Sequence, residues 1–398
     1  MSEELLALSA ETAHLKRSVM RELLAVAVDP DILSMAGGLP AADLLPLKPI
    51  AAALASVLER DGPRALQYSP MDAGLSQWVA GYMTQRGVAC GAEQVFITNG
   101  AQQGLAILSR MLLDPGSPAV IEAVTFTGVQ QVTVGRGAEV RCVPTDLETG
   151  VEVEALESAF RQAPRPRLAV LIPDFHNPLG VSISLEKRKA VAQLSERYGV
   201  PIIEDDPYSA LRFAGESLPP IKSFDRAGLV FYLGSFSKTI APALRMGWLI
   251  GPQDLIPRIT VVRESMDLET STLLQRAVAS FLKAGELESH LTRMAQAHRE
   301  RSGALLGALE QELGDLASWT RPQGGLFVWV TLPPNVDAWE LFPRALERKV
   351  AYIPGRAFAV EGGHRNTLRL NFSNLGPAQI HEAVGRLAQV IRAAAQRG

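Results

Sequence analysis

Short apolar segments alternate with helical patterns through the middle of the chain. Seven segments are candidate strands, and several are rich in Val, Ile and Leu without polar alternation: 95–98, 119–123, 140–144, 168–172, 201–205, 229–233 and 246–250. Strands of this kind are covered on both faces. Helical patterns separate some of them, as at 100–113 and 185–198. This alternation predicts an α/β fold with a mostly parallel, seven-stranded sheet.

The pattern changes near residue 254, where long helical stretches begin. Leu, Met and Ala recur at helical spacing over 286–313. The C-terminal part mixes strands and a final helix, at 326–331, 350–353, 367–372 and 377–395. We therefore expect an N-terminal arm, a large domain and a small α+β domain, over residues 1–45, 46–283 and 284–398. An Ala-rich helix is expected over about 47–60.

Composition and charge exclude several classes of protein. The 398 residues are 47% hydrophobic and 20% charged, as in a globular protein, and the net charge of −3 favours neither nucleic acid nor an anionic membrane. No apolar run reaches the roughly 20 residues of a membrane span. Cys90 and Cys142 lack the spacing of a metal site. We expect a soluble cytoplasmic protein without a metal.

The most informative motif is Gly234-Ser-Phe-Ser-Lys238, which ends an apolar strand and is followed by Arg245. Only 8 of the 39 basic residues are lysines, so Lys238 indicates a use for the amine itself. A partly desolvated amine becomes a nucleophile, which a guanidinium does not. Hydroxyl and guanidinium donors at Ser235, Ser237 and Arg245 suit a phosphate. Together these groups suggest pyridoxal phosphate bound as a Schiff base, while an ordinary lysine at a strand end is the alternative.

Three further segments each suit part of the same cofactor. Residues 100–102 begin a helix, whose amides and dipole attract anions. Phe126 follows a strand and could stack on a pyridine ring, and Asn177 could donate to a phenolic oxygen. Taken singly, these residues are equally explained as a helix cap, a core aromatic residue and a turn.

Two charged residues in strands carry more information. Asp205 ends a nearly continuous apolar strand, where a carboxylate needs a partner, and it could hold a pyridine nitrogen protonated. Tyr208 could reach the phenolic oxygen, although an N-capping pair at Asp205 and Asp206 would also explain the acids. Arg369 alternates with Leu368 and Leu370, so it points to the opposite face and could grip an α-carboxylate.

With these motifs in order, the chain resembles the fold-type-I pyridoxal phosphate enzymes, and among them the class I/II aminotransferases. It is similar to the group of 2-aminoadipate aminotransferases, kynurenine aminotransferase II and the aminotransferase domains of MocR-type regulators. The resemblance covers about residues 15–392. It rests on the motifs Ala36-Gly-Gly-Leu-Pro40, Leu66-Gln-Tyr-Ser-Pro70, Asp205-x-x-Tyr208, Ser235-Phe-Ser-Lys238, Arg245, Pro322-Gln-Gly-Gly-Leu-Phe-Val-Trp329 and Leu368-Arg369-Leu370.

The resemblance implies a role for each matching residue. Lys238 would form the Schiff base and move the substrate's proton, Asp205 would pair with the ring nitrogen, and Tyr208 would contact the phenolic oxygen with Asn177. The remaining cofactor contacts would come from Gly100, Ala101, Gln102, Phe126, Ser235, Ser237 and Arg245. Substrate contacts would come from Arg369, Asn177, Gly38, Leu39 and Tyr68, with Tyr68 supplied by the second subunit of a homodimer.

Two positions depart from the family pattern, and one matching position concerns the substrate. Phe126 replaces a frequent Tyr and Leu179 a usual Thr, so the pocket or its cofactor affinity is expected to differ. Arg21 matches an arginine that meets acidic side chains in 2-aminoadipate aminotransferases. Leu44, Leu45 and Phe126 suggest that apolar or aromatic side chains also fit.

The expected reaction is a ping-pong transfer of an amino group between an L-amino acid and a 2-oxo acid such as 2-oxoglutarate. A decarboxylase, a β-lyase or a racemase on the same fold is the alternative, although Arg369 favours chemistry that keeps the carboxylate. A ligand-sensing domain without catalysis is the remote alternative, because only about 35 residues precede Gly37.

Overall fold

A computed structural model of the chain describes residues 12, 15, 23, 29 and 31–396. Its larger sheet has seven strands in the order β2-β10-β9-β8-β7-β3-β4. Their bounds are Val95–Thr98 (β2), Pro118–Glu122 (β3), Glu139–Val143 (β4), Leu168–Leu171 (β7), Ile202–Asp206 (β8), Val230–Ser235 (β9) and Gly247–Ile250 (β10). Strand β10 is antiparallel to both neighbours and every other pairing is parallel. The prediction of a mostly parallel seven-stranded sheet is confirmed.

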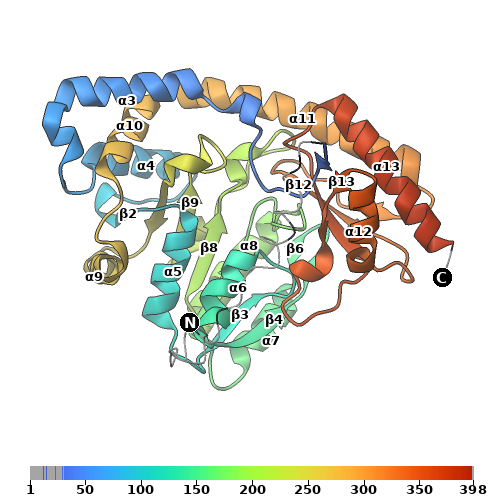
Figure 1. Cartoon of the computed structure of the whole chain (residues 1–398). Helices are drawn as coiled ribbons and strands as arrows, with labels where there is room; N and C mark the ends of the chain where they lie inside the picture. Colours follow the sequence, from blue (N-terminus) through green and yellow to red (C-terminus); the bar gives the residue numbers. More distant parts are fainter. Residues whose placement is uncertain (1–11, 13–14, 16–22, 24–28, 30, 397–398) are drawn as a thin grey trace, which may run out of the picture.

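Helices cover both faces of this sheet, which explains why its strands are apolar on successive positions (Figure 1). On β3, Ile121 packs in the core under α5, whereas its neighbour Val120 packs in the core under α7 and α8. The helices around the sheet are α4 (Ala73–Gln85), α5 (Ala101–Leu112), α6 (Thr127–Thr133), α7 (Val153–Arg161), α8 (Leu185–Tyr198), α9 (Ile256–Asp267) and α10 (Thr272–Lys283). Two short strands, β5 (Thr145–Asp146) and β6 (Gly150–Val151), pair with each other.

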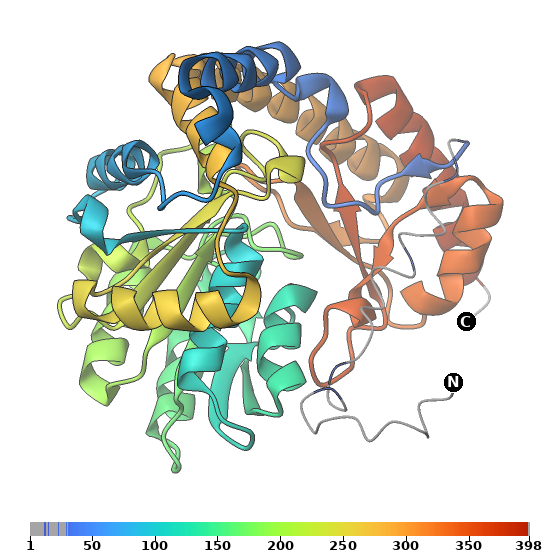
Figure 2. The same cartoon turned by 60° about the vertical axis from the view of Figure 1, so that its left-hand side comes forward.

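A second, antiparallel sheet has the order β11-β12-β15-β14 and its own apolar core. Its strands are Ser318–Trp319 (β11), Phe327–Thr331 (β12), Ile353–Pro354 (β14) and Thr367–Asn371 (β15). Helices α12 (Ala338–Glu347) and α13 (Pro377–Ala395) pack there, and the long helix α11 (Glu286–Leu313) contacts both α10 and α13. Figure 2 shows the two sheets side by side, with α3 (Leu47–Asp61) and α11 running across one edge.

The predicted strand over 350–353 is wrong as a single strand. Residues Val350–Ala351 form β13, which pairs in parallel with β1 (Leu33–Ser34), while β14 pairs with β15. The local apolar pattern is continuous, but the backbone changes partners at Tyr352 and so joins two sheets. Through β1, the N-terminal segment is attached beside the smaller sheet.

The topology places several loops at one edge of the larger sheet. Strands β2, β3, β7, β8 and β9 point the same way, so their carboxyl ends lie together. In open α/β sheets, ligands bind beyond these ends. Strand β15 of the smaller sheet faces this edge, because Arg369 reaches Asn177 in the loop after β7.

Candidate active site

A cavity of about 630 Å³ lies between the carboxyl ends of the larger sheet and strand β15. Of the residues predicted to bind cofactor or substrate, 13 line this cavity: Gly38, Leu39, Ala101, Gln102, Phe126, Asn177, Asp205, Tyr208, Ser235, Ser237, Lys238, Arg245 and Arg369. They come from segments spread over more than 300 residues of the chain. The fold therefore brings together groups that the sequence presents as separate motifs.

Two predicted residues that the structure describes are not part of the cavity wall. Gly100 lies next to the guanidinium of Arg245, which lines the cavity. The side chain of Tyr68 is 76% exposed and borders a separate surface groove with residues 269–273. Arg21 lies outside the described residues.

Lys238 is a largely desolvated amine inside the cavity. Its Nζ donates a hydrogen bond of 2.7 Å to the carbonyl oxygen of Gly38. Burial, reinforced by the charges of Arg369 and Arg245, lowers the pKa of Lys238 from its ordinary 10.5 to about 8. The amine therefore loses its proton near pH 8, well below the range of an ordinary lysine, and the unprotonated form is the one that attacks a carbonyl.

Asp205 is a buried carboxylate with an unused acceptor. The residue is 3% exposed, it faces the cavity, and its Oδ1 has no hydrogen-bond partner. Burial and the neighbouring charge of Asp206 raise the pKa of Asp205 to about 7. A protonated heteroaromatic nitrogen would satisfy this oxygen and compensate its charge.

A set of donors suited to a phosphate lies at the other side of the cavity. The guanidinium of Arg245 donates to Ser237 Oγ at 3.3 Å and to the carbonyl oxygen of Asn99 at 3.1 Å. Helix α5 begins at Ala101, and its first amides lack partners within the helix. Gly100 has a φ of +78°, and a Cβ there would come within 2.8 Å of Arg245 Nη2. Only glycine allows the arginine and the helix terminus to approach so closely.

Arg369 offers a fixed guanidinium for a carboxylate. It is 1% exposed, and its Cζ lies 4.2 Å and 4.8 Å from the ring centroids of Phe327 and Phe358. Its Nη1 donates to Asn177 Oδ1 at 2.7 Å, and its Nη2 donates to the carbonyl oxygen of Ala36 at 2.5 Å. Burial lowers the pKa of Arg369, so an anion in the cavity would relieve an unfavourable buried charge.

Asn177 connects the guanidinium to Tyr208. Because its Oδ1 accepts from Arg369, its amide nitrogen is left to donate elsewhere. It donates toward Tyr208, whose pKa is raised by burial in spite of Arg369 and this donor. Both side chains thus present polar atoms to the cavity beside Asp205.

The segment 36–39 closes one wall through its backbone carbonyls. The oxygens of Ala36, Gly38 and Leu39 accept hydrogen bonds from Arg369, Lys238 and Ser373. Beyond this segment, the carboxylate of Asp43 forms an ion pair of 2.7 Å with Arg301 of α11.

Some wall residues were not identified from the sequence, and some expected ones lie elsewhere. Asn374, which follows β15 by three positions, lines the cavity, as do Ser34 and Ile172. The signal for Asn374 was a polar run after a strand, which is also common in loops. Leu179 packs in the core of the smaller sheet, so its departure from Thr does not alter the cavity wall. Leu44 and Leu45 were expected in the pocket but do not line it, because Leu44 packs beside Tyr208 and Phe327.

Within the described part of the chain, no group of three or more His, Cys, Asp or Glu side chains could hold a metal ion. Likewise, none of the helices described is long and apolar enough to cross a bilayer.

Comparisons with known proteins agree with this geometry. The sequence model of the aminotransferase class I and II family matches residues 31–387. A 2-aminoadipate transaminase from Thermus thermophilus is 39% identical over 384 residues, covering 95% of each chain. Aromatic-amino-acid aminotransferase 1 from Thermococcus litoralis is 34% identical over 395 residues, covering 96% of this chain and 94% of that protein.

A solved structure is similar over the full length of both chains. It is an α-aminoadipate aminotransferase from Thermus thermophilus, complexed with N-(5'-phosphopyridoxyl)-L-leucine, with a TM-score of 0.92 and 36% identity. The groups in the present cavity fit such a cofactor: an amine of lowered pKa, an orphaned buried carboxylate and an arginine beside a helix N-terminus. The chain belongs to the aminotransferase class I and II family and is a pyridoxal-phosphate-dependent aminotransferase of fold type I.

Proposed function

We propose that the enzyme transfers the amino group of acidic L-amino acids, such as glutamate and 2-aminoadipate, to 2-oxo acids such as 2-oxoglutarate. The observation that carries this proposal is the convergence of Lys238, Asp205 and Arg369 in one cavity. These are an amine, a partner for a cationic ring and a carboxylate-binding guanidinium. The 2-aminoadipate transaminase among the relatives supports the choice of acidic substrates.

Each proposed role follows from the position of a side chain. Bound pyridoxal phosphate supplies an electron sink for a bond to the substrate's α-carbon. Lys238 Nζ attaches the cofactor and then carries the proton of the α-carbon, for which its lowered pKa is suitable. Asp205 holds the proton on the ring nitrogen. Arg369 orients the substrate's α-carboxylate by a two-pronged contact.

The phosphate and ring of the cofactor have separate proposed supports. Ser235, Ser237 and Arg245 bind the phosphate together with the start of α5, at residues 100–102. Phe126 stacks on the ring, and Asn177 and Tyr208 bind its phenolic oxygen. Gly38 and Leu39 line the substrate entrance.

The side chain of the substrate meets a mainly apolar wall. Leu39, Phe126 and Ile172 line the cavity and suit aliphatic or aromatic groups, in agreement with the aromatic-amino-acid aminotransferase among the relatives. The cations among the described lining residues are Lys238, Arg245 and Arg369, and each has a proposed role already. We therefore propose that Arg21 supplies the charge that selects acidic side chains.

We also propose a homodimer, a domain division and a cellular location. Tyr68 is too exposed to serve its own cavity, which supports its use by the other subunit of a dimer. The separate cores of the two sheets support a large domain over 46–283 and a small one over 284–398, preceded by an arm over 1–45. Cys90 and Cys142 are free, which suits a reducing cytoplasm.

A spectroscopic titration tests the function. The purified protein should be yellow, L-glutamate should abolish the visible band, and 2-oxoglutarate should restore it. Arg21→Ala should weaken the response to glutamate and 2-aminoadipate but leave the response to leucine or phenylalanine. A band that responds to neither acidic nor apolar L-amino acids would overturn the proposed substrates. Equal loss for both classes would remove Arg21 from side-chain selection.

A further inference from the structure

Strand β8 ends in three consecutive acids, and each of them has a different environment in the fold. Side chains alternate along a strand, so Glu204 and Asp206 lie on one face and Asp205 on the other. Glu204 accepts hydrogen bonds from the backbone nitrogens of Ile221 and Lys222, at 2.7 Å and 2.8 Å. Asp206 is bound by side chains from other elements. Asp205 alone of the three faces the active-site cavity.

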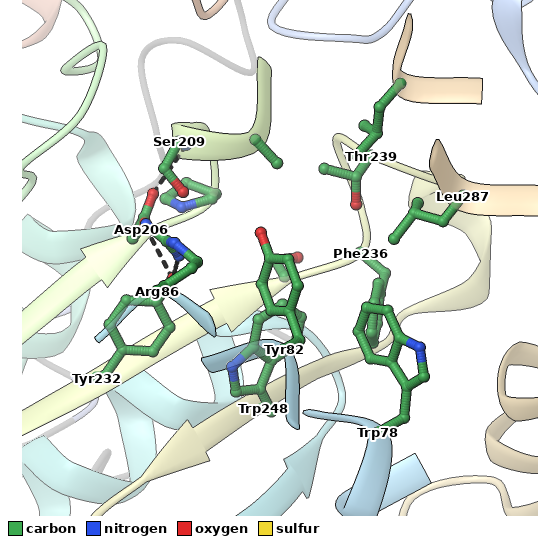
Figure 3. A pocket seen from close by; sticks show the side chains of 14 residues that line it. Trp78, Tyr82, Arg86, Asp206, Ser209, Tyr232, Phe236, Thr239, Trp248 and Leu287 are labelled. Carbon is green, nitrogen blue, oxygen red and sulfur yellow. Dashed lines mark hydrogen bonds and ion pairs between the residues drawn. The ribbon is translucent and has the colours of Figure 1, made fainter. Parts of the chain in front are cut away.

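The contacts of Asp206 form a closed network behind the active site (Figure 3). Its Oδ2 forms an ion pair of 3.0 Å with Arg86 at the end of α4 and accepts from the hydroxyl of Tyr232 at 2.8 Å. Its Oδ1 accepts from the backbone nitrogen of Ser209 at 2.9 Å. Arg86 also donates to the oxygen of Tyr232 at 2.5 Å. The side chains of Asp206 and Arg86 are only 1% and 16% exposed.

The side chains packed around this network are mainly aromatic or aliphatic. Trp78, Tyr82, Phe236 and Trp248 pack beside it, around a cavity of about 20 Å³ that has room for about one water molecule. Low polarity strengthens the electrostatic effect of each buried charge. A change of charge at Asp206 is therefore felt at Asp205, the next residue along the chain.

Asp206 is a carboxylate in this setting. Burial alone would raise its pKa, but Arg86 and the hydrogen bonds from Ser209 and Tyr232 lower it overall. A guanidinium keeps its charge at all ordinary pH values. The network therefore holds a permanent negative charge next to Asp205, with its counter-ion on the far side.

The cationic groups that face Asp205 across the cavity have the opposite effect to Asp206 on the protonation of Asp205. Arginine and lysine charges there favour loss of a proton from any neighbouring group. Among the described residues, the charged and titratable groups around Asp205 are Lys238, Arg245 and Arg369 across the cavity, Tyr208 beside it, and Glu204 and Asp206 on its own strand. Within this set the two acids of β8 oppose the cations, and of these Asp206 has the lowered pKa.

We propose that Asp206, kept ionised by Arg86 and Tyr232, is a positioning residue that acts through Asp205 to retain the proton on the ring nitrogen of the cofactor. Its negative charge offsets the cations that the substrate and phosphate sites require. The inference rests on the proposed role of Asp205. No contact between Asp206 and the cofactor is needed.

The test measures the proton itself in the holoenzyme. Enzyme loaded with ring-¹⁵N pyridoxal phosphate is titrated with pH, and the ¹⁵N chemical shift reports the protonated fraction of the ring nitrogen. The double variant Arg86→Met/Asp206→Asn removes both charges together, so no buried charge is left unpaired. The amide oxygen introduced at position 206 still accepts from the backbone nitrogen of Ser209, and the amide nitrogen can donate to the oxygen of Tyr232. We expect the midpoint to fall by less than about one pH unit. Loss of a negative charge roughly 10 Å away is worth about one unit at an effective dielectric constant of about 20, and loss of the more distant positive charge of Arg86 partly offsets it.

A matched double variant separates this effect from loss of any buried ion pair. Lys222→Met/Asp225→Asn removes an ion pair of similar burial, 11% and 3% exposed, near the opposite end of β9. It should destabilise the fold to a similar degree but leave the ¹⁵N midpoint unchanged. If both double variants shift the midpoint equally, or neither does, the proposal is overturned.

A second measurement uses the full chain without cofactor and does not depend on loading. With ¹³C in the side-chain carboxyls of aspartate only, Glu204 is silent and Asp205 is assigned by its loss in Asp205→Asn. The midpoint of Asp205 should fall in Asp206→Asn and rise in Arg86→Met, because these variants leave opposite charges behind. Shifts in the same direction, or none, would contradict the inference.

Failure of the proposed role of Asp205 looks different. In that case Asp205→Asn would bind ¹⁵N-labelled cofactor without a change in the ring-nitrogen shift. A change with Asp205→Asn but none with the Arg86/Asp206 double variant rejects the role of Asp206 alone.

Discussion

A buried amine and a buried carboxyl group in the same cavity both have pKa values shifted toward neutral pH. The pKa of Lys238 falls to about 8 and that of Asp205 rises to about 7, because burial disfavours the charged form of each. Each group is unfavourable in the free enzyme and would gain a partner from the cofactor. At the scale of single residues, cofactor binding should therefore relieve an unfavourable environment at both Lys238 and Asp205.

The shifted pKa of Lys238 predicts a pH-dependent stability of the cofactor-free protein. The unfolded chain keeps the lysine proton up to pH 10.5, whereas the folded chain releases it near pH 8. Between these values the unfolded state binds more protons, so the free energy of unfolding should rise with pH, by on the order of 3 kcal/mol at most. Urea unfolding at pH 7.5 and pH 10 measures this rise.

Two variants complete this test. In Lys238→Met the rise of the free energy of unfolding with pH should largely disappear. The stability of this variant relative to the parent should therefore be higher at pH 7.5 than at pH 10. Lys283→Met, which removes an exposed lysine at the end of α10, should behave like the parent. Identical pH dependence in Lys238→Met and the parent would show that Lys238 is not desolvated.

The position of Arg369 predicts that substrate binding depends on the planar shape of its guanidinium as well as on its positive charge. Arg369→Lys keeps the positive charge but loses the planar fork held between Phe327 and Phe358. One lost charge-assisted hydrogen bond of about 1.5–3 kcal/mol should raise the glutamate concentration for half-conversion roughly 10–100-fold. The absorbance change on adding glutamate measures it, and the spectrum before glutamate should match the parent. An unchanged glutamate dependence would mean that another group binds the carboxylate.

At the scale of elements, the start of α5 is set by the end of β2. The chain must turn sharply after Thr98 and then present helix amides to the cavity, which places Gly100 in the positive φ region. The same glycine leaves room for the guanidinium of Arg245, which itself has a positive φ of 48°. Backbone strain and ligand binding thus coincide at one turn.

Substitution of two glycines separates the effect on backbone strain from the effect on ligand binding. Gly100 and Gly116 have φ values of +78° and +81°, but a Cβ at Gly116 would meet nothing within 4 Å. Alanine at either position should cost about 1–2 kcal/mol of stability, measured by urea unfolding. Only Gly100→Ala should also weaken binding of pyridoxal phosphate, roughly 10-fold, because it displaces Arg245. Equal cofactor affinity in the two variants would exclude Arg245 from the phosphate site.

At the scale of the whole molecule, two large apolar residues are exposed beside each other in the segment after α3. Leu66 and Tyr68 are 73% and 76% exposed and border the same surface groove. Large apolar groups exposed together are typical of an interaction surface. A second copy of the chain is the partner that would also bring Tyr68 to a cavity.

This surface predicts the oligomeric state. The parent should sediment at twice its chain mass of 42.9 kDa. Leu66→Glu should shift it toward the monomer and reduce transaminase activity, because a buried unpaired charge opposes association. Leu147→Glu, at a 41% exposed leucine between β5 and β6, should remain dimeric. A parent that sediments as a monomer would reject the dimer.

The order of elements and the chemical groups of the site were determined by the sequence itself. Strand positions follow from local apolar runs, and a lysine, an aspartate and an arginine at strand ends are recognisable one motif at a time. The seven strands of the larger sheet lie within two residues of their predicted bounds at every end. Such features depend on residues that are close in the sequence, so they can be predicted without knowledge of the fold.

Only the tertiary structure decided which distant groups meet. The reversed direction of β10, the split of 350–353 into β13 and β14, and the ion pair of Arg86 with Asp206 all join segments whose local patterns carry no sign of a partner. The same holds for the carbonyl of Gly38, 200 residues from the amine of Lys238. Strand pairing and buried polar contacts are settled by packing of the whole chain, which alone fixes the charges that surround Lys238 and Asp205.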